Sequence, residues 1–541
     1  AAVVRRVTAH FQLVAGMGPS GADVGTLLGV GDDVLEEMLR SADDFRFAEP
    51  PRLDLFLCCV REFHSQLYAN FAHLYRDVGA LSPMDMLQLV AWLQEYRERL
   101  QAAEAPLLNP PLVPVQRALI EEYAKQSRAT WCEWMVNLHK SDIEYLNEGR
   151  LEEDGGTPTP VDLLRMLNEP FSSIENLQVP ALTNVLLAAC GHVIRQFAEL
   201  QKQHLRGLVS AALGAEAAKL DATLRLRAAC GMMHNAERAR ALLEQLGSHL
   251  DASDEVLAAV DGRSKSLAAL AEVERLGSEE QTASQALDDA DMALGLVGAV
   301  AVGVLCGLSL YCGGQASPRP PLAVHELLPL DQEALAAAFG ALGNSALWLR
   351  RHVAEAFVAK LERSLLKMLV AHVIEALLCG KANLLVDESC ADAPAPAGLR
   401  VLQALLAFVQ AALVNISQKA VSIEVSALQA LLETANCRAE NFASKFAEMC
   451  RQYPEVGLPH AEAMLARRTS MNKNESKELA LHAVQQAGAE NPSLPATEDN
   501  WPPAELLALA KAPFALATLR LAPKKAALKG LASAALGRLG R

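Results

Sequence analysis

The sequence predicts an all-α protein, and three observations carry this prediction. From Pro83 to Gln101, apolar residues recur at the three- and four-residue spacing of one helix face. From Val353 to Leu377, every fourth residue is apolar. No convincing run of residues alternates between apolar and polar with the period of two that a half-buried strand requires. We therefore expect helices along the chain and no sheet.

The predicted helices differ in how many of their faces are apolar. The first has one apolar face, formed by Met86, Leu89, Val90, Leu93, Tyr96 and Leu100. In the second, four residues turn slightly more than one revolution, so the apolar row drifts around the helix. A companion row widens it further, with Val358, Leu366, Val370, Ile374 and Leu378. We expect this helix to lie in the middle of a bundle, and the segments 402–413 and 425–432 repeat the pattern.

Proline- and glycine-rich segments interrupt the helical pattern and predict the domain boundaries. These segments are 104–114, 148–160, 317–321, 391–398 and 491–503. They divide the chain into an N-terminal helical bundle, a central helical bundle, an apolar insert with a proline-rich linker, a C-terminal helical bundle and a basic tail. The predicted bounds are 1–110, 111–286, 287–345, 346–495 and 496–541.

The composition excludes several classes of protein. Of the 541 residues, 51% are hydrophobic, which excludes a mostly disordered chain. A net charge of −15 and only 5% aromatic residues argue against nucleic-acid binding. The 11 cysteines include no C-x-x-C pair, which is typical of a reduced, cytosolic protein. The chain starts without methionine or a signal-peptide layout, and we expect it to begin inside a longer protein.

One segment is long and apolar enough to cross a membrane. Met292–Gly314 holds 23 residues without a charge, flanked by Asp288, Asp289 and Asp291 before it and Arg319 after it. A membrane span is one interpretation. A buried apolar hairpin, or a sequence outside the working fold, is the other.

The C-terminal tail has the opposite character, because it is basic. From Lys511 to Arg541 there are seven basic residues and no acidic one, with leucines spaced among them. Such a tail can contact an anionic membrane surface, or it can be a solvated tail without a role in binding. The candidate membrane-surface contacts are Lys524, Lys525, Lys529 and Arg538.

The sequence gives no argument for catalysis. The motif Gly16–Gly21 lacks the preceding strand that a phosphate-binding loop needs, and we interpret it as a loop. His234 lies near Cys230, but two residues cannot complete a zinc site, so we expect a helix-face histidine and a packed thiol. We expect no catalytic residue, no cofactor and no metal. A large helical chain of this kind is more naturally a scaffold.

Several motifs, taken in order along the first half of the chain, resemble one family. The helix Leu87–Leu100 carries Trp92 and Tyr96 in the spacing W-x-x-x-Y. Trp131-Cys-Glu-Trp-Met135 then leads through an acidic interval into Thr157-Pro-Thr-Pro-Val-Asp-Leu-Leu164. We expect Trp92, Tyr96, Trp131 and Trp134 to lie in the core, because aromatic residues at helical spacing usually pack inward.

Further motifs continue the resemblance. Cys230-Gly-Met-Met-His-Asn-Ala-Glu237 has a central asparagine after a long helix, and Tyr453-Pro-Glu-Val456 precedes Ala463-Met-Leu-Ala-Arg467 near the end. In this order and spacing, the chain resembles the Sec-six subunit family of the exocyst, also called exocyst complex component three. The matching segments cover about residues 5–285 and 346–487. Met292–Gly314 has no counterpart in that family, and neither does the proline-rich sequence after it.

The resemblance implies an elongated rod of stacked helical bundles, as in subunits of multisubunit tethering complexes. It implies a non-enzymatic subunit of the exocyst, which tethers secretory vesicles to the plasma membrane before SNARE-mediated fusion. The implied partners are the other exocyst subunits and SNARE proteins or SNARE regulators, with a possible peripheral contact to anionic membrane and none to nucleic acid. The implied location is the cytoplasm, peripheral at plasma membrane sites of secretion.

Three other interpretations remain open from the sequence. The first is an integral membrane protein anchored by residues 292–314. The second is a helical subunit of another tethering complex, since fold alone does not fix the pathway. A nucleotide-dependent enzyme built around Gly16–Gly21 would need a parallel sheet, which the sequence does not predict.

Overall fold

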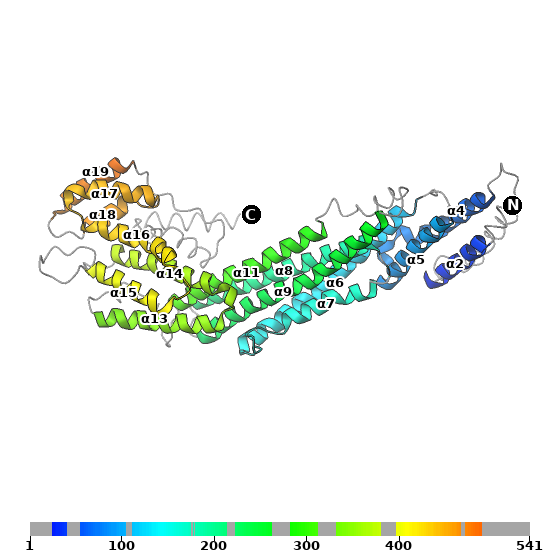
Figure 1. The fold of residues 1–541 in the computed structure, drawn as a ribbon, viewed down its shortest axis with the longest axis horizontal. Coiled ribbons are helices and arrows are strands. Elements are labelled where there is room, and N and C mark those ends of the chain that lie inside the picture. Colours follow the sequence, from blue (N-terminus) through cyan, green and yellow to red (C-terminus); the bar gives the residue numbers. More distant parts are fainter. Residues whose placement is uncertain are drawn as a thin grey trace. The chain divides into compact units, whose positions relative to one another are not determined.

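A computed structural model describes residues 24–40, 55–103, 111–174, 177, 179–213, 222–261, 282–311, 332–379, 397–466 and 471–488. Within these ranges the chain forms fifteen α-helices, one short 3₁₀ helix (Val78–Ala80) and no strand. The all-α prediction is therefore confirmed. Figure 1 shows the helices in chain order. They are α2 (Val24–Arg40), α4 (Leu55–Arg76), α5 (Pro83–Ala102), α6 (Val113–Glu148), α7 (Thr159–Ile174), α8 (Pro180–Leu213), α9 (Ala222–Asp261), α11 (Ala283–Tyr311), α13 (Gln332–His352), α14 (Glu355–Cys379), α15 (Ala397–Ala412), α16 (Gln418–Asn436), α17 (Ala439–Gln452), α18 (Leu458–Leu465) and α19 (Lys473–Ala487).

Local sequence explains where several helices begin. The Ser82 side chain accepts a hydrogen bond of 3.1 Å from the Asp85 amide, and Pro83 occupies the first position of α5. Ser417 caps α16 in the same way. At α19, Asn472 and Glu475 form a reciprocal capping box. These caps satisfy amide groups that have no partner within the helix.

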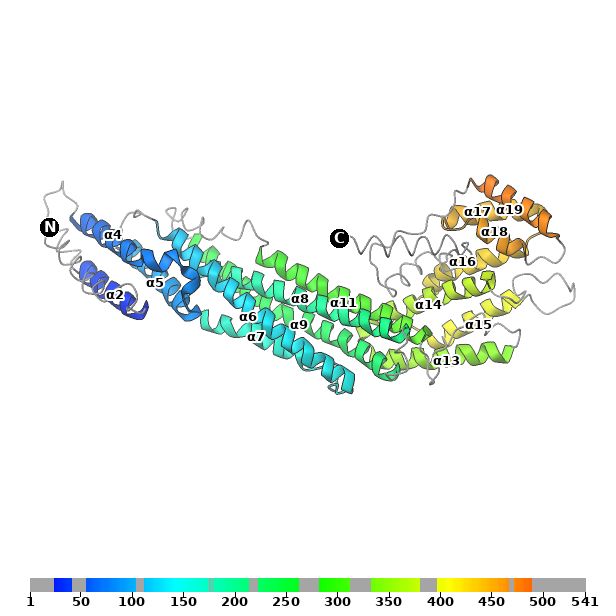
Figure 2. The same ribbon diagram turned by 180° about the vertical axis from the view of Figure 1, so that it is seen from behind.

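The chain divides into two compact units. The first unit contains residues 1–141, 159–198 and 238–294. In it, parts of α6, α7, α8 and α9 lie side by side in both views (Figures 1 and 2). A close approach joins α8 to α11: a Cβ added at Gly191 would lie 2.6 Å from the backbone oxygen of Ala286. A larger residue at that position would therefore push the two helices apart.

The second unit contains residues 142–158, 199–237 and 295–541. In it, α13 packs against α15, α14 against α16, and α19 against both α17 and α18. Every residue of α14 from Met368 to Leu378 is buried. This confirms the prediction that the helix with the drifting apolar row has neighbours on several sides. The division into five domains is not tested by this organisation and stays a prediction.

The described part of the apolar segment, residues 292–311, belongs to a single helix, not to a hairpin. Helix α11 is long and apolar enough to cross a membrane, and 67% of its most apolar stretch is buried inside the protein. In the second unit, a Cβ added at Gly298 would lie 2.2 Å from the Phe357 ring on α14. The Cys306 thiol faces the backbone oxygen of Leu361 at 3.8 Å. The described part of the segment is thus packed against neighbouring helices of the same chain.

Candidate functional site

Few of the sequence-predicted contact residues can be placed. Lys524, Lys525, Lys529 and Arg538 lie outside the described residues, and so does the Gly16–Gly21 motif. The motifs that carry the family resemblance lie largely within the described residues. They form polar contacts between helices, and these contacts are the candidate functional features of the chain.

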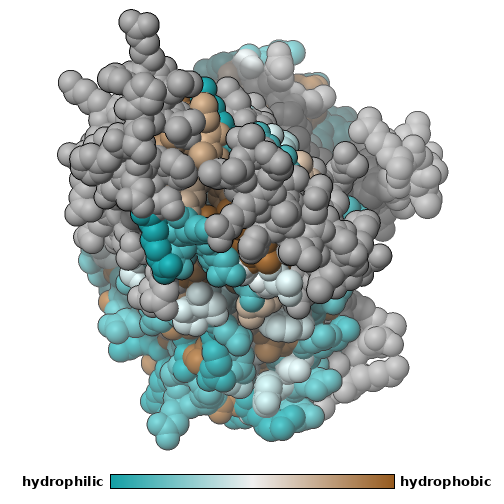
Figure 3. Space-filling model, turned by 90° about the vertical axis from the view of Figure 1, so that its right-hand side faces the viewer, coloured by the Kyte–Doolittle hydropathy of each residue, from teal (hydrophilic) through white to brown (hydrophobic). Residues whose placement is uncertain are grey.

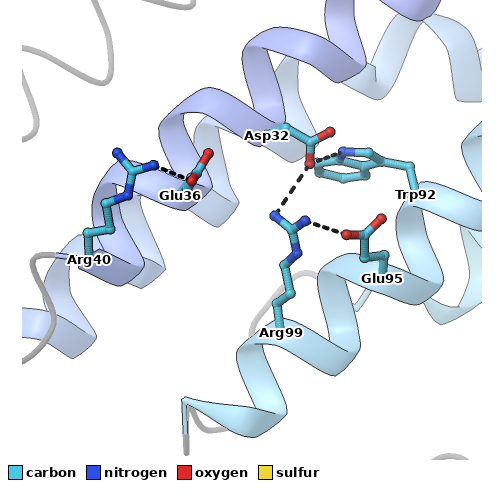
Figure 4. Close-up of polar contacts among 6 residues, drawn as sticks. All are labelled: Asp32, Glu36, Arg40, Trp92, Glu95 and Arg99. Atoms are coloured by element: carbon cyan, nitrogen blue, oxygen red, sulfur yellow. Dashed lines mark hydrogen bonds and ion pairs between the residues drawn. The ribbon is translucent and has the colours of Figure 1, made fainter.

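The W-x-x-x-Y motif holds α2 against α5 (Figure 4). The Trp92 indole N–H donates a hydrogen bond of 2.9 Å to the Asp32 carboxylate on α2, and Gly31 leaves room for the ring. Arg99 lies between Asp32, at 3.9 Å, and Glu95 (Figure 4). Burial raises the pKa of Asp32, while the hydrogen bond from Trp92 and the charge of Arg99 oppose this effect. The motif thus connects α5 to α2 through the hydrogen bond from Trp92 to Asp32.

Tyr96, the second aromatic residue of the motif, connects α5 to α4. Its ring stacks on Trp92, with the ring centres 5.2 Å apart. Its hydroxyl lies 3.0 Å from Nδ1 of the buried His64. The motif therefore joins α5 to α2 through Asp32 and to α4 through His64, and Trp92 and Tyr96 are buried as predicted.

A buried polar network joins three helices and a turn in the second unit. Its members are Asp142 on α6, Thr157 in the turn after that helix, Gln201 on α8 and Asn235 on α9, and each is at most 1% exposed. The Asn235 amide donates to Asp142 and to the Thr157 hydroxyl at 2.9 Å each, and its oxygen accepts from the Thr157 amide at 2.8 Å. Gln201 donates to the second Asp142 oxygen at 2.6 Å.

The acidic turn before Thr157 is shaped to reach this network. Gly155 has a φ of +86°, which favours glycine, and the Gly156 amide donates to the Asp154 carboxylate at 2.9 Å. A Cβ added at Gly155 would lie 3.2 Å from the His234 ring, whose Nε2 lies 3.0 Å from the backbone oxygen of His352. Burial raises the pKa of the Cys230 thiol to about 12. Cys230 and His234 are thus a packed thiol and a helix-face histidine, as predicted.

The C-terminal motif forms the junction between α17 and α18. The Tyr453 hydroxyl lies 2.9 Å from the Ser426 hydroxyl on α16. Val456 is buried, and the ring of His460 accepts a hydrogen bond of 3.1 Å from the Gly457 amide. This motif therefore fixes the turn between two helices.

The prediction that Trp131 and Trp134 both lie in the core is half wrong. Trp131 is buried, but Trp134 is 49% exposed. The buried stripe of α6 runs through Trp131, Met135, His139, Asp142 and Leu146, and position 134 lies beside it. Two members of this stripe are polar, so the apolar pattern of the sequence does not reveal its direction.

Charged pairs fix the first part of α11 within the first unit. Arg240 on α9 holds Asp291 with two hydrogen bonds of 2.7 and 2.9 Å. Arg195 on α8 approaches Asp289 at 3.6 Å. Two of the acidic residues before the apolar segment, Asp289 and Asp291, thus have cationic partners on neighbouring helices.

The visible surface is mainly polar. On the face in Figure 3, most described residues are hydrophilic and the hydrophobic ones form small separate spots. Among the residues that the structure describes, no group of three or more His, Cys, Asp or Glu side chains is arranged to hold a metal ion. The polar contacts described above connect helices.

Comparison with known proteins gives two findings. Residues 7–213 match the family Sec6, described as exocyst complex component Sec6. The designation as component three does not appear in that description, and the resemblance is corrected accordingly. The motifs at 230–237 and 453–467 lie outside the matched residues. No curated protein matches the chain.

A solved structure shares the fold. It is the crystal structure of the C-terminal domain of the exocyst subunit Sec6p, with a TM-score of 0.53 and 10% sequence identity. The match covers 69% of this chain and 91% of that one. At this identity the likeness shows the fold alone. The sequence match is confined to residues 7–213, and the likeness in fold extends beyond it.

Proposed function

We propose that this chain is a non-enzymatic Sec6-type subunit of the exocyst, which tethers secretory vesicles to the plasma membrane before SNARE-mediated fusion. The observation that carries the proposal is the match of residues 7–213 to the exocyst component Sec6. The all-helical fold is consistent with it, because helices joined by buried polar contacts suit a scaffold. The motifs that resemble the family connect helices through polar contacts.

The proposed partners are the other exocyst subunits, and SNARE proteins or SNARE regulators. The proposed location is the cytoplasm, peripheral at plasma membrane sites of secretion. A tether of this kind binds its partners through several weak contacts at the same time, and their combined affinity keeps the assembly together. Contact of the basic tail with anionic membrane is a further part of the proposal, and it rests on Lys524, Lys525, Lys529 and Arg538 alone.

Affinity purification of the full-length protein from its native cells, followed by mass spectrometry, tests this proposal. We expect the other exocyst subunits in amounts comparable to the bait. Recovery of a different tethering complex would move the chain to another membrane step. An untagged strain serves as the control for non-specific recovery.

An integral membrane protein is the second candidate, because α11 has the length and hydropathy of a membrane span. The Arg240–Asp291 pair in the first unit and the Gly298–Phe357 contact in the second argue for a helix packed within the protein. Extraction of membranes with alkaline carbonate separates the two candidates. A peripheral subunit is released into the supernatant, whereas a spanning protein stays in the pellet.

A further inference from the structure

In the first unit, the chain presents an exposed Ser-Pro dipeptide where α5 begins. Gly79, Ala80, Ser82 and Pro83 are exposed, and the next side chain, Met84, is 64% exposed. Within residues 79–84, Ser82 is the one residue with a hydroxyl group. This hydroxyl therefore lies at the surface of the described part of the unit.

The backbone before Pro83 has the extended form in which peptides lie in the binding grooves of enzymes. Leu81 has a φ of −75° and a ψ of 144°, and Ser82 has a φ of −69° and a ψ of 153°. Pro83 favours this form, because the residue before a proline avoids the helical region. Leu81 and Ser82 can therefore be bound as an extended peptide without a change of their backbone conformation.

Ser82 differs in accessibility from the other hydroxyl residues that precede a proline. The sequence has four of them, Ser82, Thr157, Thr159 and Ser317. Thr157 is 0% exposed and belongs to the buried polar network, and Thr159 is 2% exposed. Ser317 lies outside the described residues. Among the described residues, an enzyme that recognises a hydroxyl next to proline can thus reach Ser82 and neither threonine.

We propose that Ser82 is the phosphorylation site of a proline-directed protein kinase. Pro83 decides the class of enzyme: it lacks an amide hydrogen, so an apolar pocket of the kinase can enclose it without leaving a donor unpaired. An acidophilic kinase would instead recognise Asp85, three residues after Ser82. That carboxylate is already engaged, since it accepts a hydrogen bond of 2.7 Å from the Ser82 hydroxyl in the first turn of α5. The proposal goes beyond the proposed function and does not depend on it.

The reaction uses ATP as the phosphoryl donor. The Ser82 Oγ forms a bond to the γ-phosphorus, the bond from that phosphorus to the bridging oxygen breaks, ADP leaves, and the hydroxyl proton passes to a carboxylate of the kinase. Ser82 then has no hydrogen to donate to Asp85, and the phosphate adds negative charge beside that carboxylate. The modification therefore changes the cap of α5, the helix that Trp92 and Tyr96 connect to α2 and α4.

Incubation of the purified full-length protein with ATP and a cyclin-dependent kinase tests the proposal. Trypsin cleaves after Arg76 and Arg97 and releases residues 77–97, in which Ser82 is the only serine or threonine. Mass spectrometry of this fragment over time therefore measures the phosphorylation of Ser82. The variant Ser82→Ala serves as the control, and we expect no phosphate in its fragment 77–97.

The two buried threonines provide an internal comparison in the same digest. Thr157 and Thr159 lie together in the tryptic fragment 151–165. We expect the phosphate to enter fragment 77–97 at least about tenfold faster than fragment 151–165. Equal rates, or faster modification of fragment 151–165, would overturn the proposal.

Two variants separate the proline-directed class of kinase from the acidophilic class. Pro83→Ala keeps the Ser82 hydroxyl but removes the proline, and Asp85→Asn keeps the Ser-Pro dipeptide but removes the carboxylate. We expect Pro83→Ala to slow the modification at least about tenfold, and Asp85→Asn to leave it within about twofold of the wild type. The reverse pattern, or faster modification of the wild type by casein kinase II, would overturn the proposal.

The protein purified from its native cells in the presence of phosphatase inhibitors shows whether the site is used. We expect part of fragment 77–97 to carry one phosphate group. Recovery of this fragment in the unmodified form alone would overturn the proposal. This result does not depend on which subunits are recovered with the chain, so either the phosphorylation site or the proposed function can fail without the other.

Discussion

Replacing Asn235 with alanine tests whether the buried polar network stabilises the second unit. The substitution removes two donated hydrogen bonds and one accepted bond, all at a position with no exposed surface. It deprives the Asp142 carboxylate of one donor and the Thr157 amide of its acceptor. Each buried group left unsatisfied costs about 1–3 kcal/mol. We therefore expect the free energy of unfolding to fall by about 3 kcal/mol.

The measurement is urea unfolding followed by circular dichroism at 222 nm. The matched control is Asn137→Ala, the same substitution at an exposed position of α6. We expect the control to change the unfolding free energy by less than about 0.5 kcal/mol. If Asn235→Ala unfolds at the same urea concentration as the control, the network does not stabilise the fold and the reasoning is wrong.

Two further predictions concern packing and pH. Gly298→Ala would place a Cβ 2.2 Å from the Phe357 ring, and we expect it to lower the free energy of unfolding by about 1–3 kcal/mol. Gly307→Ala, on the same helix, has open space around the added Cβ, and we expect it to leave the free energy of unfolding unchanged or to raise it by up to about 1 kcal/mol. Thermal unfolding of both variants measures the difference. Burial lowers the folded-state pKa of His139, and burial with the charges of two arginines lowers that of His192. As the pH falls, the unfolded chain therefore takes up protons before the folded chain does. Stability is then constant above about pH 6.5 and falls as the pH drops below it. An unfolding midpoint that rises as the pH is lowered from about 7 to about 5.5 would contradict this.

The helical class could be predicted because it depends on periodicity alone. The drifting apolar row of α14 predicted a helix surrounded by others, and its run of buried residues from Met368 to Leu378 confirms this. The same signal failed on α6. There the buried stripe includes His139 and Asp142, so hydropathy did not show which way Trp134 points.

The contacts between motifs were not predictable from one sequence. Asn235 and Thr157 were both singled out as parts of motifs, yet nothing in the sequence indicates that they meet. Asp142 was missed because aspartate side chains are usually solvent-exposed. Its spacing of seven residues from Met135 on the buried stripe was the one available signal. Such pairings depend on long-range packing, which local pattern does not encode.

Helix α11 shows why composition alone cannot separate a membrane span from a core helix. Both need a long run without charges, and both tolerate glycine where another helix comes close. The difference lies in the partners of the flanking charges and in what the glycines contact. In the first unit, Asp291 is held by two hydrogen bonds from Arg240, and in the second unit Gly298 receives the Phe357 ring. A helix tied to the protein in both ways has its apolar partners within the chain, and leaving them for a bilayer would break both contacts.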